Sequence, residues 1–163
     1  MKKKVLSVGK DYTYTLPNFR ELILECDIPE QGNLIFAGCP GPCYSMATFF
    51  GFAIRDLNLN QYFAVNSDMN QLWRLEYKDN LGVVATSKVD ALKGNVIVLM
   101  SGLLRIPIEN TLDLIKNALV DEGIIIGEAP APGLFEKEGW DKEIRFRYLF
   151  EFSMKDPTAS KIQ

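Results

Sequence analysis

Apolar residues along the chain fall into short runs of strand length, separated by segments in which they recur every three or four positions. The mainly apolar runs predict buried strands at residues 33–37, 61–65, 81–86, 95–100 and 124–127. Helical spacing of apolar positions predicts helices at residues 19–26, 44–57, 68–75, 87–94 and 108–122. The two kinds of element alternate, which is typical of α/β proteins with a parallel or mixed sheet.

The last apolar segment follows a different pattern. Between Ile144 and Phe152, apolar and mostly aromatic residues alternate with more polar ones. A period of two predicts a half-buried strand, and we expect it to run antiparallel at an edge of the sheet. The predicted fold is therefore a three-layer Rossmann-like sandwich, with a mostly parallel sheet and an antiparallel C-terminal edge strand. An alternative use for the aromatic face of this strand is a homodimer contact.

The length of 163 residues suits a single α/β domain spanning residues 1–163, large enough to bury a core. No stretch of the sequence resembles a linker between two cores. We expect the ends of the chain, residues 1–16 and 155–163, to be frayed.

The net charge, the cysteine count and the absence of histidine exclude several classes of function. The net charge of −3 offers no overall positive field for nucleic acid, and no apolar run approaches the roughly 20 residues that span a membrane. Three cysteines, an odd number, fit a reducing cytoplasm better than a secreted disulfide framework. The absence of histidine excludes Ser-His and Cys-His catalytic pairs, so any acid–base chemistry must use carboxylates, lysine, tyrosine or thiolates.

The sharpest motif is the turn Gly38-Cys39-Pro40-Gly41-Pro42-Cys43, which joins a predicted strand to a predicted helix. Open α/β folds bind ligands at such turns, where the carboxyl ends of strands meet helix N-termini. The same rule points to the turns at residues 66–68 and 101–105, and to Glu128 after a later strand.

Four interpretations of the cysteine turn stay open. Cys39 and Cys43 could be small, partly buried structural residues. The start of the helix could bind an anion through its backbone N–H groups. The thiols could be redox-active or nucleophilic, since a helix N-terminus stabilises a thiolate. Metal binding is the least favoured, because no histidine can complete a tetrahedral set, and we expect no metal site.

The preferred hypothesis is a site for a small anionic or phosphorylated ligand at the strand ends. Glycine and hydroxyl residues would cradle and orient the ligand, and an arginine and an aspartate would complete the site. These candidate residues are Gly38, Gly41, Ser45, Ser67, Asp68, Ser101 and Arg105. The alternatives are a thiol-based redox or thiolate–metal protein that uses Cys39 and Cys43, and a structural or partner-binding subunit. The sequence specifies no cofactor and leaves open whether any reaction is catalysed.

The turn, together with the apolar helix Phe49-Phe50-Gly51-Phe52-Ala53-Ile54 that follows it, resembles a small family of uncharacterised archaeal proteins known mainly from methanogens. The resemblance extends over most of the chain, and the Gly-Cys-Pro-Gly-x-Cys turn is its one sharp motif. It implies an archaeal cytosolic protein with an α/β fold, and it implies no activity.

Overall fold

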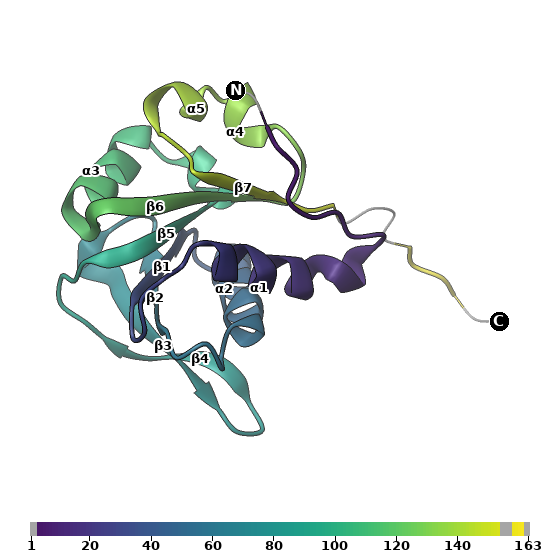
Figure 1. The fold of residues 1–163 in the computed structure, drawn as a ribbon, viewed down its shortest axis with the longest axis horizontal. Coiled ribbons are helices and arrows are strands. Elements are labelled where there is room, and N and C mark those ends of the chain that lie inside the picture. Colours follow the sequence, from purple (N-terminus) through teal and green to yellow (C-terminus); the bar gives the residue numbers. More distant parts are fainter. Residues whose placement is uncertain (1–2, 154–157, 162–163) are drawn as a thin grey trace.

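The computed structural model describes residues 3–153 and 158–161, and seven strands of this part of the chain form one sheet (Figure 1). The strand order is β4-β3-β2-β1-β5-β6-β7. The strand bounds are β1 (Asn33–Gly38), β2 (Asn60–Val65), β3 (Leu72–Lys78), β4 (Gly82–Lys88), β5 (Gly94–Met100), β6 (Leu119–Ala129) and β7 (Tyr148–Glu151). Strands β2, β1, β5, β6 and β7 are parallel, whereas β3 and β4 are antiparallel to their neighbours.

Helices cover both faces of this sheet. On one face lie α1 (Thr15–Glu25) and α2 (Pro42–Ala53), and on the other lie α3 (Ile108–Ala118), α4 (Leu134–Lys137) and α5 (Trp140–Glu143) (Figure 1). Short 3₁₀ turns are η1 (Tyr12–Tyr14), η2 (Met69–Gln71) and η3 (Ser101–Arg105). The α/β class and the mostly parallel sheet between two helical layers are confirmed.

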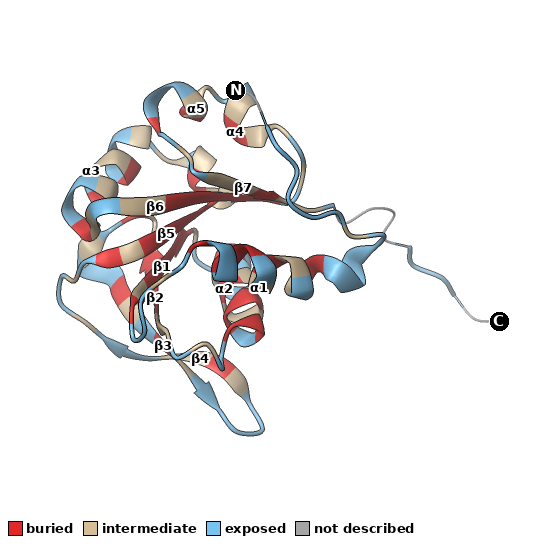
Figure 2. Cartoon of the chain, viewed as in Figure 1, coloured by how far each residue is buried: buried red, intermediate tan, exposed pale blue. Residues whose placement is uncertain are grey.

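The central strands are buried on both faces, as parallel strands between two helical layers must be (Figure 2). In β1, Leu34 and Phe36 join the cluster under α1 and α2, while Ile35 and Ala37 join the cluster under α3, α4 and α5. This two-sided burial explains why the strand is a continuous apolar run rather than an alternating one.

The direction predicted for the last strand is wrong. β7 pairs parallel to β6, with Ile126 opposite Tyr148, and the antiparallel strands are β3 and β4 at the other edge. The period of two reports which residues face the core but carries no information about strand direction. Direction is set here by the connection, because α4 and α5 return the chain to the start of β7 before it re-enters the sheet.

Three predicted helices are also shorter than expected or absent. Asp68 does cap a helical turn, accepting a hydrogen bond from the Asn70 amide at 2.8 Å, but that turn is only η2, and Leu72 already begins β3. Residues 89–93 form an irregular connection. The helix ending before Gly123 stops at Ala118, and β6 follows directly. At residues 72–75, at Lys88 and at Leu119, pairing with a neighbouring strand overrides local helical spacing.

The prediction that residues 1–16 are frayed is wrong for residues 12–16, because η1 and the start of α1 fall within that range. Residues 154–157 and 162–163, which include most of the other predicted frayed end, lie outside the described part of the chain. Within residues 3–153 and 158–161, no helix is long and apolar enough to span a bilayer.

The aromatic cluster under α1 and α2 should dominate stability. Phe50 is fully buried, and its ring centroid lies 4.6 Å from that of Phe19 and 5.6 Å from that of Phe150. We expect Phe50→Ala to lower the free energy of unfolding by about 3–5 kcal/mol in urea denaturation, because it leaves a cavity. Phe52→Ala, in the same helix but at a side chain 38% exposed, is the matched control and should cost about 1 kcal/mol. Equal losses would contradict this assignment of the core.

Candidate functional site: a pair of thiols at the switch point of the sheet

The connections of the sheet diverge between β1 and β5. From β1 the chain passes through α2 to β2 on one side, whereas from β5 it passes through α3 to β6 on the other. The carboxyl ends of β1 and β5 therefore border a topological switch point, the position at which open α/β sheets bind ligands. The loops that meet there are the cysteine turn after β1 and η3 after β5.

The start of α2 brings the two cysteines together. Gly41, the residue before the helix, has a φ of 79°, a value that favours glycine, and Pro42 supplies the fixed φ of the first helical residue. Cys43 is thereby buried beneath the first turn, while Cys39 in the preceding loop is half-buried. Their Sγ atoms lie 2.8 Å apart as a thiol–thiol hydrogen bond.

Two glycines make room for this pair. A Cβ atom on Gly102 would lie 2.5 Å from Cys39 Sγ and would also collide with Cys43 Sγ. A Cβ atom on Gly38 would lie 2.5 Å from Cys43 Cβ and 3.1 Å from Met100 Sδ. Real Cβ contacts are not this short. The thiols therefore fit at this position because Gly38 and Gly102 have no side chains.

Burial keeps Cys43 protonated. Desolvation is the main cause that raises its pKa to about 12, and the hydrogen bond with Cys39 adds to the shift. The backbone amide of Gly102 hydrogen-bonds the sulfur and acts in the opposite direction, but it does not outweigh burial. At neutral pH Cys43 is therefore a thiol, and the more exposed Cys39 is the sulfur that an external reactant meets first.

A second buried group with a raised pKa is a carboxyl group on β6, the strand next to β5. Glu128 on β6 is opposite Met100 in the sheet register, and only 3% of its surface is exposed. Burial raises its pKa to about 7, and a hydrogen bond from the Ser101 backbone partly opposes the shift. The consecutive amides of Ser101 and Gly102 thus engage the Glu128 carboxyl group and the Cys43 sulfur. Both buried groups therefore meet the same two-residue segment that follows β5.

The other predicted ligand residues are distributed around this centre. Gly38, Gly41 and Ser101 lie at it, through the contacts just described. Ser45 is exposed on the first turn of α2, and Arg105 is exposed at the end of η3.

The turn after β2 adjoins the same edge of the sheet. The Asn66 amide donates a 2.8 Å hydrogen bond to the Gly38 carbonyl oxygen. Ser67 is buried and bonds the Thr111 hydroxyl at 3.0 Å, so this hydroxyl is occupied within the protein. Asp68 remains exposed.

The sequence points to Glu128 as a strand-end residue, but the predicted ligand set does not include it. The signal for it is a carboxylate that directly follows the run Ile124-Ile125-Ile126-Gly127 and precedes Ala129, at the carboxyl end of β6. A charged residue in such a strand is rarely fully buried unless its pKa shifts or it is paired.

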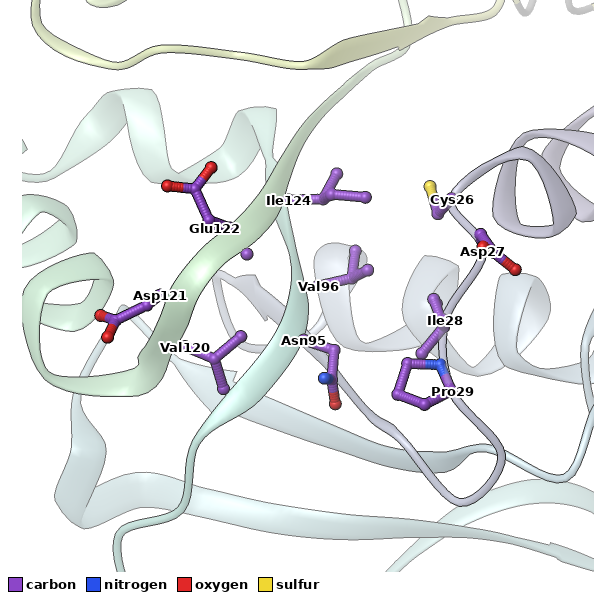
Figure 3. A pocket seen from close by; sticks show the side chains of 11 residues that line it. Cys26, Asp27, Ile28, Pro29, Asn95, Val96, Val120, Asp121, Glu122 and Ile124 are labelled. Carbon is purple, nitrogen blue, oxygen red and sulfur yellow. The ribbon is translucent and has the colours of Figure 1, made fainter.

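The third cysteine belongs to another part of the molecule. Cys26 follows α1 and lines a cavity of about 180 Å³ at the amino ends of β5 and β6, where Asn95 and Val96 separate it from Val120 (Figure 3). Its thiol donates to the Leu22 carbonyl oxygen at 3.2 Å. In the part of the chain that the structure describes, no three acidic or cysteine side chains are grouped to hold a metal ion.

The fold and this site define an open α/β protein that carries two adjacent thiols at its switch point and a buried carboxyl group at the end of β6. The chain belongs to the family described as "Uncharacterized protein conserved in archaea (DUF2124)", whose model matches residues 12–155. The predicted resemblance to archaeal proteins is thereby confirmed.

Relatives and a solved structure agree with this assignment. The chain is 32% identical over 157 residues to the uncharacterized protein MJ1183 of Methanocaldococcus jannaschii, covering 95% of this chain and 93% of that protein. It is 30% identical over 135 residues to an uncharacterized protein of Methanothermobacter thermautotrophicus, covering 78% and 80% of the two chains. A crystal structure of a protein of unknown function from the same organism superimposes with a TM-score of 0.83 at 23% identity, over 99% of this chain and 100% of that one, and so shares the fold.

The raised pKa of Glu128 gives stability a defined pH dependence. The folded protein holds this proton up to about pH 7, whereas the unfolded chain releases it near 4.5, so the contribution to stability is complete at low pH and is lost between these values. We expect Glu128→Gln to remove that decline. Relative to its own value at pH 4, the variant should be more stable than the parent by up to about 3 kcal/mol at pH 8. Chemical denaturation across this range, with the exposed Asp121→Asn as control, measures the effect, and parallel curves for all three proteins would contradict it.

Proposed function

We propose that this protein is a dithiol–disulfide exchange protein in which Cys39 and Cys43 alternate between two thiols and one disulfide. The observation that supports this most directly is the 2.8 Å separation of the two sulfur atoms at the switch point of the sheet. Disulfide formation requires little more than rotation of the side chains and closure of that gap. The unequal exposure of the two thiols further supports it, because exchange needs one accessible and one shielded sulfur.

The reaction proceeds in two displacements. The thiolate of Cys39 attacks one sulfur of a substrate disulfide, the substrate S–S bond breaks, and the departing thiolate takes a proton from water. Cys43 then loses its proton, and its sulfur attacks Cys39 Sγ. This second step forms the Cys39–Cys43 disulfide and releases the remaining half of the substrate as a thiol. Two protein thiols are oxidised and one substrate disulfide is reduced to two thiols, and an external thiol reductant restores the pair.

Glu128 has a role in the second displacement. Cys43 holds its proton strongly, because its pKa is raised to about 12, so resolution of the mixed disulfide needs a proton acceptor. The carboxylate of Glu128, with a pKa of about 7, would accept this proton in the relevant pH range through a bridging solvent or substrate molecule, because the amides of Ser101 and Gly102 only donate hydrogen bonds. Glu128 acts on the sulfur chemistry from outside the exchanging atoms, as a positioning and proton-holding residue.

The anionic-ligand hypothesis has weaker support. The free start of α2 and the exposed Ser45 suit an anion, but the space next to Gly38 and Gly102 is filled by the thiols themselves. A structural or partner-binding role gives no reason for two contacting thiols at the switch point or for a buried acid with a pKa near 7 at the end of β6. In the reducing cytoplasm that the cysteine content favours, the resting state of the exchange protein would be the dithiol.

Oxidation tests the proposal directly. With a glutathione disulfide buffer, we expect the protein to lose two hydrogens by intact-mass measurement, and peptide mapping should locate the bond between Cys39 and Cys43. Cys26→Ser is the matched control and should oxidise like the parent, because Cys26 lies at the other end of the sheet. Cys43→Ser should stop at a mixed disulfide with glutathione on Cys39. Three free thiols throughout, or a stable mixed disulfide in the parent, would overturn the proposal.

The role of Glu128 predicts a particular pH profile. In the parent, the rate of mixed-disulfide resolution should rise between about pH 6 and 8 as Glu128 becomes a carboxylate, and stopped-flow detection of the released thiol reports it. Glu128→Gln should flatten this rise and lower the rate at pH 8 by roughly 10²-fold. Glu128→Asp should restore part of the pH dependence. An unchanged profile in Glu128→Gln would assign Glu128 a purely structural role.

A further inference from the structure

A third sulfur atom lies next to the two thiols. Met100, the last residue of β5, is only 1% exposed and belongs to the same buried cluster as Cys43, with Cys39 packed against that cluster. A Cβ atom on Gly38 would lie 3.1 Å from Met100 Sδ and 3.2 Å from Cys43 Sγ, so these two sulfur atoms border the same point. Since Cys39 Sγ contacts Cys43 Sγ, two thiols and one thioether are grouped at the carboxyl ends of β1 and β5.

Backbone donors surround the buried thiol of this group. The backbone N–H groups of Cys39 and Gly102 both hydrogen-bond the sulfur of Cys43. Cys43 also lies in the first turn of α2, where the helix dipole favours negative charge. Hydrogen bonds of this kind orient and stabilise the thiolate ligands of metal sites. The surroundings of Cys43 therefore suit a sulfur that binds a metal ion as a thiolate.

The number and type of the sulfur atoms select the class of ion. Zn²⁺ prefers four ligands, but the chain has no histidine, and its described part holds no group of three acidic or cysteine side chains. Cu(I) is a soft ion that binds thiolate and thioether sulfur, and two or three such ligands satisfy it. The missing histidine therefore argues against a tetrahedral zinc site and leaves a copper site of lower coordination number open.

We infer that Cys39, Cys43 and Met100 form a binding site for Cu(I). The two cysteines would bind as thiolates, and the thioether of Met100 would be a neutral third ligand. Two Cu–S bonds replace two S–H bonds, both protons pass to solvent, and no electron is transferred. The thiols would separate to admit the ion through rotation of the Cys39 side chain, which is the more exposed of the two and lies in a loop with exposed Pro40 and Gly41. This site uses the reduced pair and requires no step of the proposed exchange reaction.

A copper titration tests the site. The fully reduced protein is titrated with Cu(I) without oxygen, in competition with bicinchoninate, whose Cu(I) complex is coloured. We expect each chain to withdraw one Cu(I) from the coloured complex. Cys39→Ser and Cys43→Ser should each abolish this binding, whereas Cys26→Ser is the matched control and should bind as the parent does. No withdrawal by the parent, or equal withdrawal by Cys43→Ser, would overturn the inference.

Selenium labelling tests the third ligand. In selenomethionine-labelled protein loaded with Cu(I), X-ray absorption at the selenium edge should show copper as a neighbour of selenium. Met100→Leu conserves volume in the core, and it should remove this signal and weaken Cu(I) binding about tenfold. Met69→Leu, next to the cluster on the opposite face of the sheet, is the control and should change neither.

Two outcomes separate this site from the exchange reaction. A selenium spectrum without copper, or a signal that persists in Met100→Leu, contradicts the three-sulfur site and leaves the exchange reaction intact. Conversely, a protein that binds Cu(I) with the selenium signal but keeps three free thiols in glutathione disulfide would support this site and contradict the exchange function.

Discussion

The site depends on the close approach of the first turn of α2 to the carboxyl ends of β1 and β5. That approach is possible because Gly38 and Gly102 present no side chains, so the sulfur atoms occupy the space that a Cβ would fill. The space left by these two glycines lets the helix lie close over the strands. It also allows Cys43 to be buried and the two thiols to contact each other. A methyl group at either glycine would separate elements that the rest of the core holds together.

The sheet provides the low-dielectric surroundings in which the chemistry of the site differs from that in water. Apolar side chains cover both faces of β1 and β5, and the aromatic cluster around Phe50 lies under the same helix that carries Cys43. In that environment the neutral forms of Cys43 and Glu128 are favoured, which raises both pKa values, one to about 12 and the other to about 7. The same burial therefore produces a sulfur that retains its proton and a carboxyl group that releases one near neutrality.

Much of the central architecture was predictable from sequence because the parallel strands are buried on both faces and appear as uninterrupted apolar runs. The cysteine turn was placed correctly at a strand–helix junction by its glycine and proline residues, whose backbone preferences act locally. The direction of β7, the strand identity of Leu72 and the early end of α3 depend on pairing with distant segments, which periodicity does not encode. The contact between the thiols and η3 required knowing that β5 is the neighbour of β1, although the two are far apart in sequence.

The four-residue spacing of Cys39 and Cys43 has a thermodynamic consequence for the proposed dithiol–disulfide exchange. A bond between them would close a ring with only three residues between the cysteines, and the chain entropy that a disulfide removes from the unfolded state grows with ring size. The entropic contribution for so small a ring is about 2 kcal/mol, against nearly 5 kcal/mol for a ring of about 100 residues. The two oxidation states would thus differ in resistance to unfolding by less than half of what a long ring gives, which suits the pair to repeated turnover better than to permanent cross-linking.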